Sequence, residues 1–98
     1  MSLSLRILPL AEEDIYQARP WYERQLPGLG DELLNAMEQC FERLAQSPLE
    51  FPAVHVEVRR ALLRRFTYCI YFVPMDTEAV VLAVLHGRKN PQVLHRRM

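Results

Sequence analysis

The stretch from Ala79 to Leu85, A-V-V-L-A-V-L, contains only apolar residues and leads directly into His86 and Gly87. A strand with one face in water alternates apolar and polar residues, whereas a strand covered on both faces is apolar throughout. The stretch is far shorter than the ~20 residues that a membrane-spanning helix needs. It therefore predicts a central β-strand over residues 79–86 and no membrane span.

Three other segments have the composition of β-strands. Residues 56–63 and 66–73 are rich in branched and aromatic side chains, and a turn over 74–78 separates the second from the apolar strand. Because such short connections join antiparallel neighbours, these three strands are predicted to form a meander. Apolar and polar residues alternate over residues 3–7, which predicts a further strand, expected at the edge of the sheet.

Two helices are predicted between the first strand and the meander. Apolar residues recur three and four positions apart over residues 10–26 and again from Asp31 to Gln46. Pro20 is expected to kink the first helix or to divide it, because proline lacks the N–H that an internal helical position donates. A four-residue turn, Pro27–Gly30, joins the two segments and predicts an antiparallel hairpin. Residues 49–55 are expected to form a loop.

The order of elements predicts a single domain over residues 1–98 in the α+β class. We expect a two-layer β-α-α-β-β-β fold, in which an antiparallel sheet carries the helix hairpin on one face. The predicted core joins the sheet residues Tyr68, Ile70, Phe72, Leu82 and Val84 to the helix residues Ile15, Tyr22, Leu33, Met37, Phe41 and Leu44.

Composition is that of a globular protein, with 50% apolar and 24% charged residues. The N-terminal residues lack the basic region of a secretory signal. Cys40 and Cys69 do not form a C-x-x-C pair, and we expect two buried, free thiols. These features predict a cytoplasmic protein.

Charge is divided unevenly along the chain. Residues 1–55 carry four arginines against nine acidic residues, and residues 56–98 carry eight basic residues against three acidic ones. The predicted strands are thus bordered by basic side chains, which suggests a surface for an anionic partner. The alternative is a solvated rim that prevents edge-to-edge aggregation of the sheet. The residues of this rim are Arg59, Arg60, Arg64, Arg65, Arg88, Lys89, Arg96 and Arg97.

Motifs for catalysis are scarce. The chain has no P-loop, no nucleophile elbow and no zinc-protease motif, and its three histidines have no ligand spacing, so we expect neither a metal site nor a cofactor. His86 ends the apolar strand and precedes Arg88, an arrangement that could serve acid–base chemistry on a phosphate. The alternative is a histidine that caps the strand end through a hydrogen bond to the backbone.

Several of these segments resemble one known family. The sequence VRRALLRRFTYCIYF from Val58, the turn after it and AVVLAVLHGRKNP from Ala79 resemble the final strands of the ParE/RelE toxin superfamily. AEEDI from Ala11 and WYERQLPGLGDELL from Trp21 are similar to its helix hairpin, and SPLEFP from Ser47 to the following loop. The resemblance covers nearly the whole chain. It implies a toxin of a type II toxin–antitoxin pair, often described as a plasmid-stabilisation protein.

The superfamily that the chain resembles contains two activities. RelE-like members cleave mRNA in the ribosomal A site, whereas ParE-like members inhibit DNA gyrase. In the nucleases an Arg and a His or Tyr assist attack on phosphate, and the resemblance makes Arg65 and His86 catalytic candidates, in addition to Arg88, which follows His86 closely in the sequence. The C-terminal Tyr that many of the nucleases use is absent. A pI of about 6.8 is also low for a protein that binds within ribosomal RNA. We therefore expect a ParE-like toxin that acts by binding.

The resemblance also implies partners. We expect a cognate antitoxin encoded by the adjacent gene, which contacts the basic rim, and DNA gyrase as the target. The alternative to gyrase is the ribosome with its mRNA, and a further alternative is an interaction domain without toxicity. A homodimer and a toxin–antitoxin heterotetramer are both open as assemblies.

Overall fold

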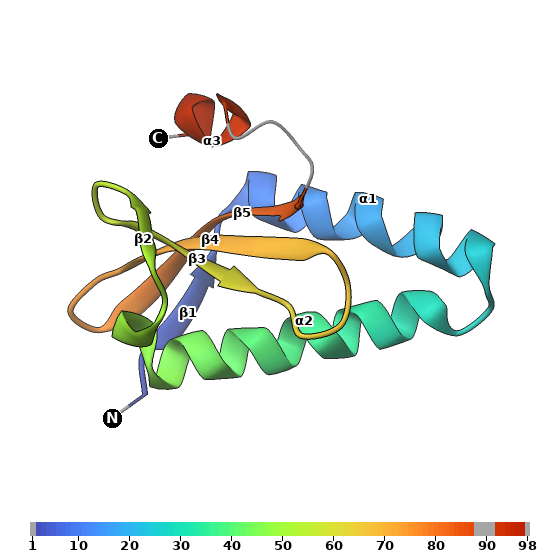
Figure 1. Cartoon of the computed structure of the whole chain (residues 1–98), viewed down its shortest axis with the longest axis horizontal. Helices are drawn as coiled ribbons and strands as arrows, with labels where there is room; N and C mark the ends of the chain where they lie inside the picture. Colours follow the sequence, from blue (N-terminus) through green and yellow to red (C-terminus); the bar gives the residue numbers. More distant parts are fainter. Residues whose placement is uncertain (1, 88–91, 98) are drawn as a thin grey trace.

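A sheet of five strands forms the centre of the protein in a computed structural model (Figure 1). The structure describes residues 2–87 and 92–97. The elements follow in the order β1 (Ser4–Ile7), α1 (Pro9–Gln25), α2 (Leu29–Gln46), the short 3-10 helix η1 (Pro48–Glu50), β2 (Ala53–His55), β3 (Val58–Leu62), β4 (Tyr68–Pro74), β5 (Glu78–His86) and α3 (Gln92–Arg97). The α+β class and the helix hairpin packed on one face of the sheet are confirmed. No described helix is long and apolar enough to cross a membrane.

The strands are arranged in the order β1-β5-β4-β3-β2. β5 is therefore an interior strand, and β1 forms an edge, as predicted. The expectation of a purely antiparallel sheet is wrong, because β1 pairs with β5 in parallel, from Ser4 opposite Glu78 to Ile7 opposite Val81. Alternation of apolar residues indicates which side chains of a strand face the core, but it contains no information on the direction of its partner.

Two elements were not predicted. The expected loop over 49–55 contains the end of η1 and the strand β2, which pairs with β3. β2 gives no alternation signal because all three of its residues are exposed at the second edge of the sheet. The other unpredicted element is α3. Six residues are too few for a helical period to be recognised in a sequence.

The helix hairpin is fixed by contacts at its turn. Gly28 adopts a left-handed conformation with φ 91°, and the Glu23 carboxylate accepts the N–H groups of Gly28 (2.9 Å) and Gly30 (3.0 Å). This carboxylate satisfies the N–H groups that begin α2 and complements the dipole of that helix. Of the two outcomes predicted for Pro20, a kink or a division, the division does not occur, since α1 is continuous from Pro9 to Gln25. Pro20 and Tyr16 lie on the exposed face, so water can hydrate the carbonyl that lacks a partner.

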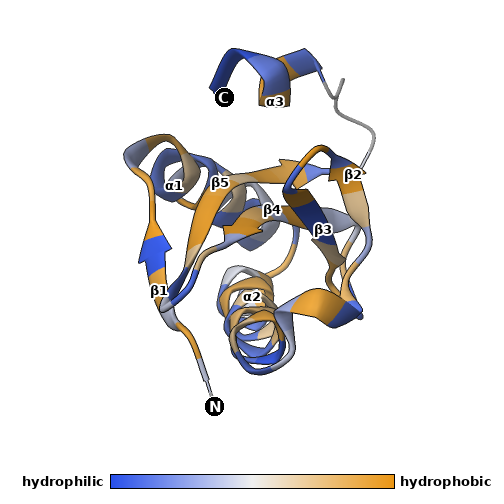
Figure 2. Cartoon of the chain, turned by 90° about the vertical axis from the view of Figure 1, so that its left-hand side faces the viewer, coloured by the Kyte–Doolittle hydropathy of each residue, from blue (hydrophilic) through white to orange (hydrophobic). Residues whose placement is uncertain are grey.

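The main core lies between the hairpin and the sheet. Of the predicted core residues, Ile70, Phe72, Val84, Leu33, Met37, Phe41 and Leu44 are buried in it, and Ile15, Tyr22 and Tyr68 are partly buried against it. Leu82 is the exception: it belongs to a second cluster on the opposite face of the sheet, together with Leu94 of α3. Figure 2 shows α2 and α3 on opposite sides of the sheet.

A β-bulge explains the position of Leu82. Tyr71 pairs with Ala83, but Phe72 pairs with Val81, so Leu82 is an extra residue in β5. The bulge changes the alternation, with the result that Val81 and Val84 both face the helices. Because both faces of β5 are apolar, the sequence gives no sign of the change.

Burial of the α2 stripe can be tested with two Leu→Ala substitutions. Leu33 is fully buried, whereas Leu10 in α1 is 56% exposed. Leu33→Ala is expected to lower the free energy of unfolding by about 2–5 kcal/mol, because it removes packed methyl groups and leaves a cavity. Leu10→Ala is the matched control and should change it by less than about 0.5–1 kcal/mol. Equal effects in urea melts would show that the helix phase is wrong.

Val56 carries backbone strain that can also be measured. It lies at the tip of the β2–β3 turn with φ 48° and is 80% exposed, so its side chain contributes little packing. A left-handed conformation is costly for a β-branched residue and tolerated by asparagine. Val56→Asn should therefore raise the free energy of unfolding by about 0.5–1 kcal/mol. Val54→Asn, within β2, should instead lower it, and a loss in both variants would exclude relief of strain.

Candidate functional site

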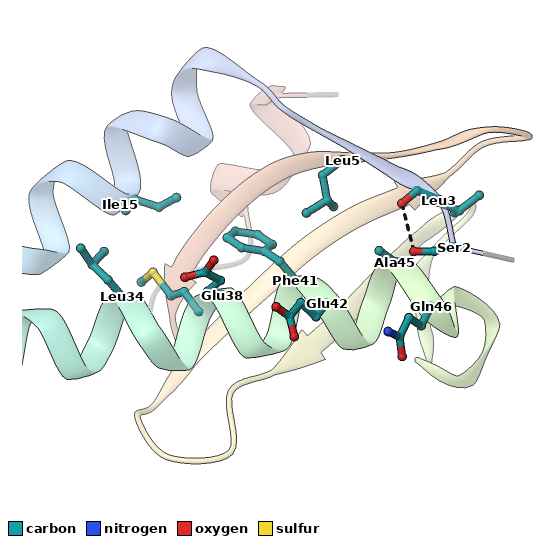
Figure 3. Close-up of a pocket in the computed structure, with 11 residues that line it drawn as sticks. Ser2, Leu3, Leu5, Ile15, Leu34, Glu38, Phe41, Glu42, Ala45 and Gln46 are labelled. Atoms are coloured by element: carbon teal, nitrogen blue, oxygen red, sulfur yellow. Dashed lines mark hydrogen bonds between the residues drawn. The ribbon is translucent and has the colours of Figure 1, made fainter.

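A groove of about 520 Å³ lies between β1, α1 and α2 (Figure 3). Its lining is mostly apolar, and Phe41 points into it in Figure 3. Glu38 and Glu42 of α2 line the same groove with carboxylates. Leu5, at the edge of the sheet, is 38% exposed beside it. The apolar residues of the groove are Leu3, Leu5, Ile15, Leu34, Met37, Phe41 and Ala45.

His86 lines a second cleft, of about 360 Å³, which is aromatic. The His86 ring contacts the Tyr68 ring edge to face, with 5.4 Å between the ring centroids. The two residues also lie opposite each other in the pairing of β4 with β5. Tyr22 contacts Tyr68 at 6.1 Å and Trp21 at 4.9 Å, both between ring centroids. Burial raises the pKa of Tyr68. The bulge in β5 is what places His86 on the same face as Val84, toward α1.

Arg65, a second catalytic candidate, lies in the turn between β3 and β4. Its Nη1 donates to Oε1 of Glu32 on α2 at 2.9 Å, and its guanidinium lies 5.2 Å from the centroid of the Phe66 ring. The ring contacts that lead from Arg65 to His86 pass through Phe66, Tyr22 and Tyr68. A nuclease site would require both side chains on one phosphate.

The predicted rim arginines have different environments. Arg59 donates to the carbonyl oxygens of Phe51 (2.6 Å) and Leu49 (3.5 Å), and so ties η1 to β3. Arg60 is half-buried. Arg64 and Arg96 are exposed and form no ion pair within residues 2–87 and 92–97. Arg88 and Lys89 lie outside the described residues.

Arg97 is held by Asp14, a residue that the sequence analysis did not single out. Nη1 and Nη2 of Arg97 donate to Oδ2 and Oδ1 of Asp14 at 2.5 and 2.9 Å, and Nη1 also donates to the Leu82 carbonyl at 3.2 Å. The Val84 N–H donates to the same carboxylate at 2.9 Å. The hydrogen bonds that Arg97 donates to the Asp14 carboxylate raise the pKa of Arg97. The pair thus supplies hydrogen-bond partners for the part of the β5 edge that β1 does not cover. It also links α3 to α1 and the sheet.

The two cysteines are buried, free thiols, as predicted. Burial is the main cause that raises the pKa of both thiols. A raised pKa disfavours the reactive thiolate. In the part of the chain that the structure describes, no group of three or more His, Cys, Asp or Glu side chains could hold a metal ion.

The Asp14–Arg97 pair is expected to be critical for stability. Both side chains are largely buried, with 9% and 13% of their surface exposed. Asp14→Ala leaves the Arg97 charge buried without its partner, and should lower the free energy of unfolding by about 3–5 kcal/mol. It should also speed amide exchange at Val84. Glu13→Ala, an exposed neighbour on α1, is the control, and similar exchange at Val84 in both variants would contradict this role for Asp14.

Comparison of the sequence with known proteins identifies the family of this chain. Residues 5–91 match the family model described as the ParE toxin of the type II toxin–antitoxin system, parDE. The chain is 30% identical over 95 residues to Toxin ParE2 of two Mycobacterium tuberculosis strains, CDC 1551 / Oshkosh and H37Rv, covering 96% of this chain and 90% of each relative.

Two solved structures share the fold. One is the chromosomal ParDE toxin–antitoxin system from P. aeruginosa, with a TM-score of 0.76, 18% identity, and coverage of 87% of this chain and 96% of that chain. The other is the RelBE2 toxin–antitoxin complex from Mycobacterium tuberculosis, with a TM-score of 0.64, 24% identity, and coverage of 88% and 99%. On the family match and the relatives, the chain belongs to the ParE toxin family of type II toxin–antitoxin systems.

Proposed function

We propose that this ParE-family toxin acts by binding DNA gyrase and inhibiting it, rather than by cleaving RNA. The observation that carries the proposal is that two catalytic candidates line different clefts: Arg65 pairs with Glu32 in one, and His86 lines the aromatic cleft. The arrangement supports a protein that acts through its surface, because a nuclease would need these groups to converge on one phosphate. A formal net charge of zero also favours a protein target over ribosomal RNA.

The proposal includes neutralisation by the product of the adjacent gene. The groove in Figure 3 offers an apolar floor to the side chains of an amphipathic segment, and its open side lies along β1, an edge strand. A segment that folds on binding can cover such a surface, with alternate or helically spaced side chains in the groove. The antitoxin would thus keep the toxin from its target by wrapping it.

Ribosome-dependent mRNA cleavage is the competing function. It draws support from the Tyr68–His86 pair, which places a phenol beside an imidazole in an open cleft. Such a pair could exchange a proton with a nucleotide substrate.

Two variants separate these functions. His86→Gln should leave growth arrest intact, because the binding energy of an inhibitor is spread over several contacts. Arg64→Glu combined with Arg88→Glu should abolish arrest through charge repulsion at the target surface. Growth after induction, plasmid supercoiling and mRNA integrity should be measured for each variant, with circular dichroism to confirm folding.

His95→Gln is the control for His86→Gln, since it makes the same chemical change at an exposed histidine of α3. A general acid–base group contributes about 10²–10⁴-fold to rate, so a nuclease would lose most of its cleavage with His86→Gln. Loss of arrest in folded His86→Gln, with ribosome-dependent cuts only in the wild type, would overturn the gyrase proposal.

A further inference from the structure

Another cleft, of about 210 Å³, lies on the opposite flank of α2 from the groove. Figure 1 shows the turn between β3 and β4 reaching toward α2, and this turn supplies one wall. The cleft contains Arg43, Arg64 and Arg65 with the side-chain amides of Asn35 and Gln39, and Glu32 is the acidic residue among the described lining. The name arginine cleft is used below for these six residues.

Arg43 has an incomplete set of partners. Its Nη2 donates to the Leu62 carbonyl at 3.3 Å, and its guanidinium lies 5.9 Å from the centroid of the Phe51 ring. Its Nε is buried and has no hydrogen-bond partner within the described residues. Leaving a buried donor of a charged group without an acceptor is costly, so the contacts within the chain satisfy Arg43 only in part.

Arg64 lines the arginine cleft and also an adjoining hollow of about 350 Å³, which it shares with Arg43. Neither Arg43 nor Arg64 forms an ion pair with any described residue, whereas Arg65 is neutralised by Glu32. Two guanidinium groups of like charge therefore line one cleft, and neither has an ion-pair partner among the described residues. A bound carboxylate could accept from both.

The surrounding charge indicates which kind of anion fits. Two acidic residues border the site, because Glu32 lines the arginine cleft and Glu50 lines the adjoining hollow. A nucleic acid presents a phosphate every few ångströms and would meet these carboxylates, whereas one acidic side chain would not. The amide groups of Asn35 and Gln39 can donate further hydrogen bonds to the same carboxylate.

We propose that the arginine cleft binds an acidic side chain of a protein segment, which, on the proposed function, belongs to the antitoxin. α2 is then a ridge between two clefts of different chemistry. One flank presents Leu34 and Phe41 to an apolar groove with carboxylates, and the other presents Arg43 to the arginine cleft. A segment that crosses α2 must offer apolar side chains to the first and a carboxylate to the second.

The test combines binding with a direct view of Arg43. The affinity of the adjacent gene's product is measured for wild type, Arg64→Gln and Arg43→Lys, with Arg24→Gln as the control at an exposed arginine of α1 outside both the cleft and the basic rim. Arg64→Gln and Arg43→Lys should each weaken binding about three- to tenfold. Arg24→Gln should stay within about twofold of wild type, as expected for a charge outside the contact. Arg64→Gln is the safer variant, because no described hydrogen bond or ion pair is lost with it.

In parallel, the Nε–Hε signal of Arg43 is followed by NMR in the isolated toxin. A short glutamate-rich peptide, inorganic phosphate and a single-stranded oligonucleotide are added in separate titrations. The peptide should shift this signal saturably in wild type and more weakly in Arg64→Gln. A stronger response to the oligonucleotide would assign the cleft to nucleic acid, and a response to phosphate alone would indicate a site for small anions; either result overturns the proposal.

The outcomes also separate this inference from the proposed function. If the adjacent product does not bind or the protein is not toxic, the proposed function fails, and the peptide titration still decides whether the cleft takes a carboxylate. If the product binds, but Arg64→Gln weakens it no more than Arg24→Gln does, the arginine cleft is not its contact. In that case the proposed function stands and this inference is wrong.

Discussion

Complete burial of β5 is the constraint on which the other elements depend. Its residues from Ala79 to Leu85 are all buried, so both faces and both edges of the strand must be covered. β4 covers one edge along most of its length, and β1 covers the first half of the other. The helix hairpin covers one face, and α3 with Leu94 packs on the opposite face. An apolar strand of this kind costs free energy wherever it meets water, so each of these elements is held in place by the same requirement.

The edge that β1 leaves uncovered accounts for the buried ion pair. β1 ends at Ile7, opposite Val81. Beyond that point Asp14 accepts a hydrogen bond from the N–H of Val84, and Arg97 donates one to the carbonyl of Leu82. A buried ion pair is stabilising only where its remaining donors and acceptors are satisfied, and here the strand edge satisfies them. In the same part of β5, the bulge at Leu82 turns His86 toward α1. The position of a candidate catalytic residue is thus a consequence of how one strand edge is closed.

The charge division along the chain becomes a division between the flanks of α2. Glu38 and Glu42 of that helix lie at the groove, and Arg64 and Arg65 of the β3–β4 turn lie across the other flank, where Glu32 pairs with Arg65. Arg59 and Arg97 bind backbone or buried groups, so an account of partner binding has to rest on other arginines. The arrangement favours a partner that wraps around the helix over one that docks on a uniformly basic face.

The sequence by itself determined the elements whose signals are local. Helical spacing identified α1 and α2, and the apolar run identified β5, because periodicity and burial are properties of consecutive residues. The family resemblance followed from the same segments. Tertiary structure alone decided the parallel pairing of β1, the bulge at Leu82, the strand β2 and the pairing of Asp14 with Arg97. Asp14 and Arg97 are 83 residues apart, and neither lies in a pattern that predicts the other. Such contacts arise from the way the sheet is closed in space, and the spacing of residues along the chain does not contain that information.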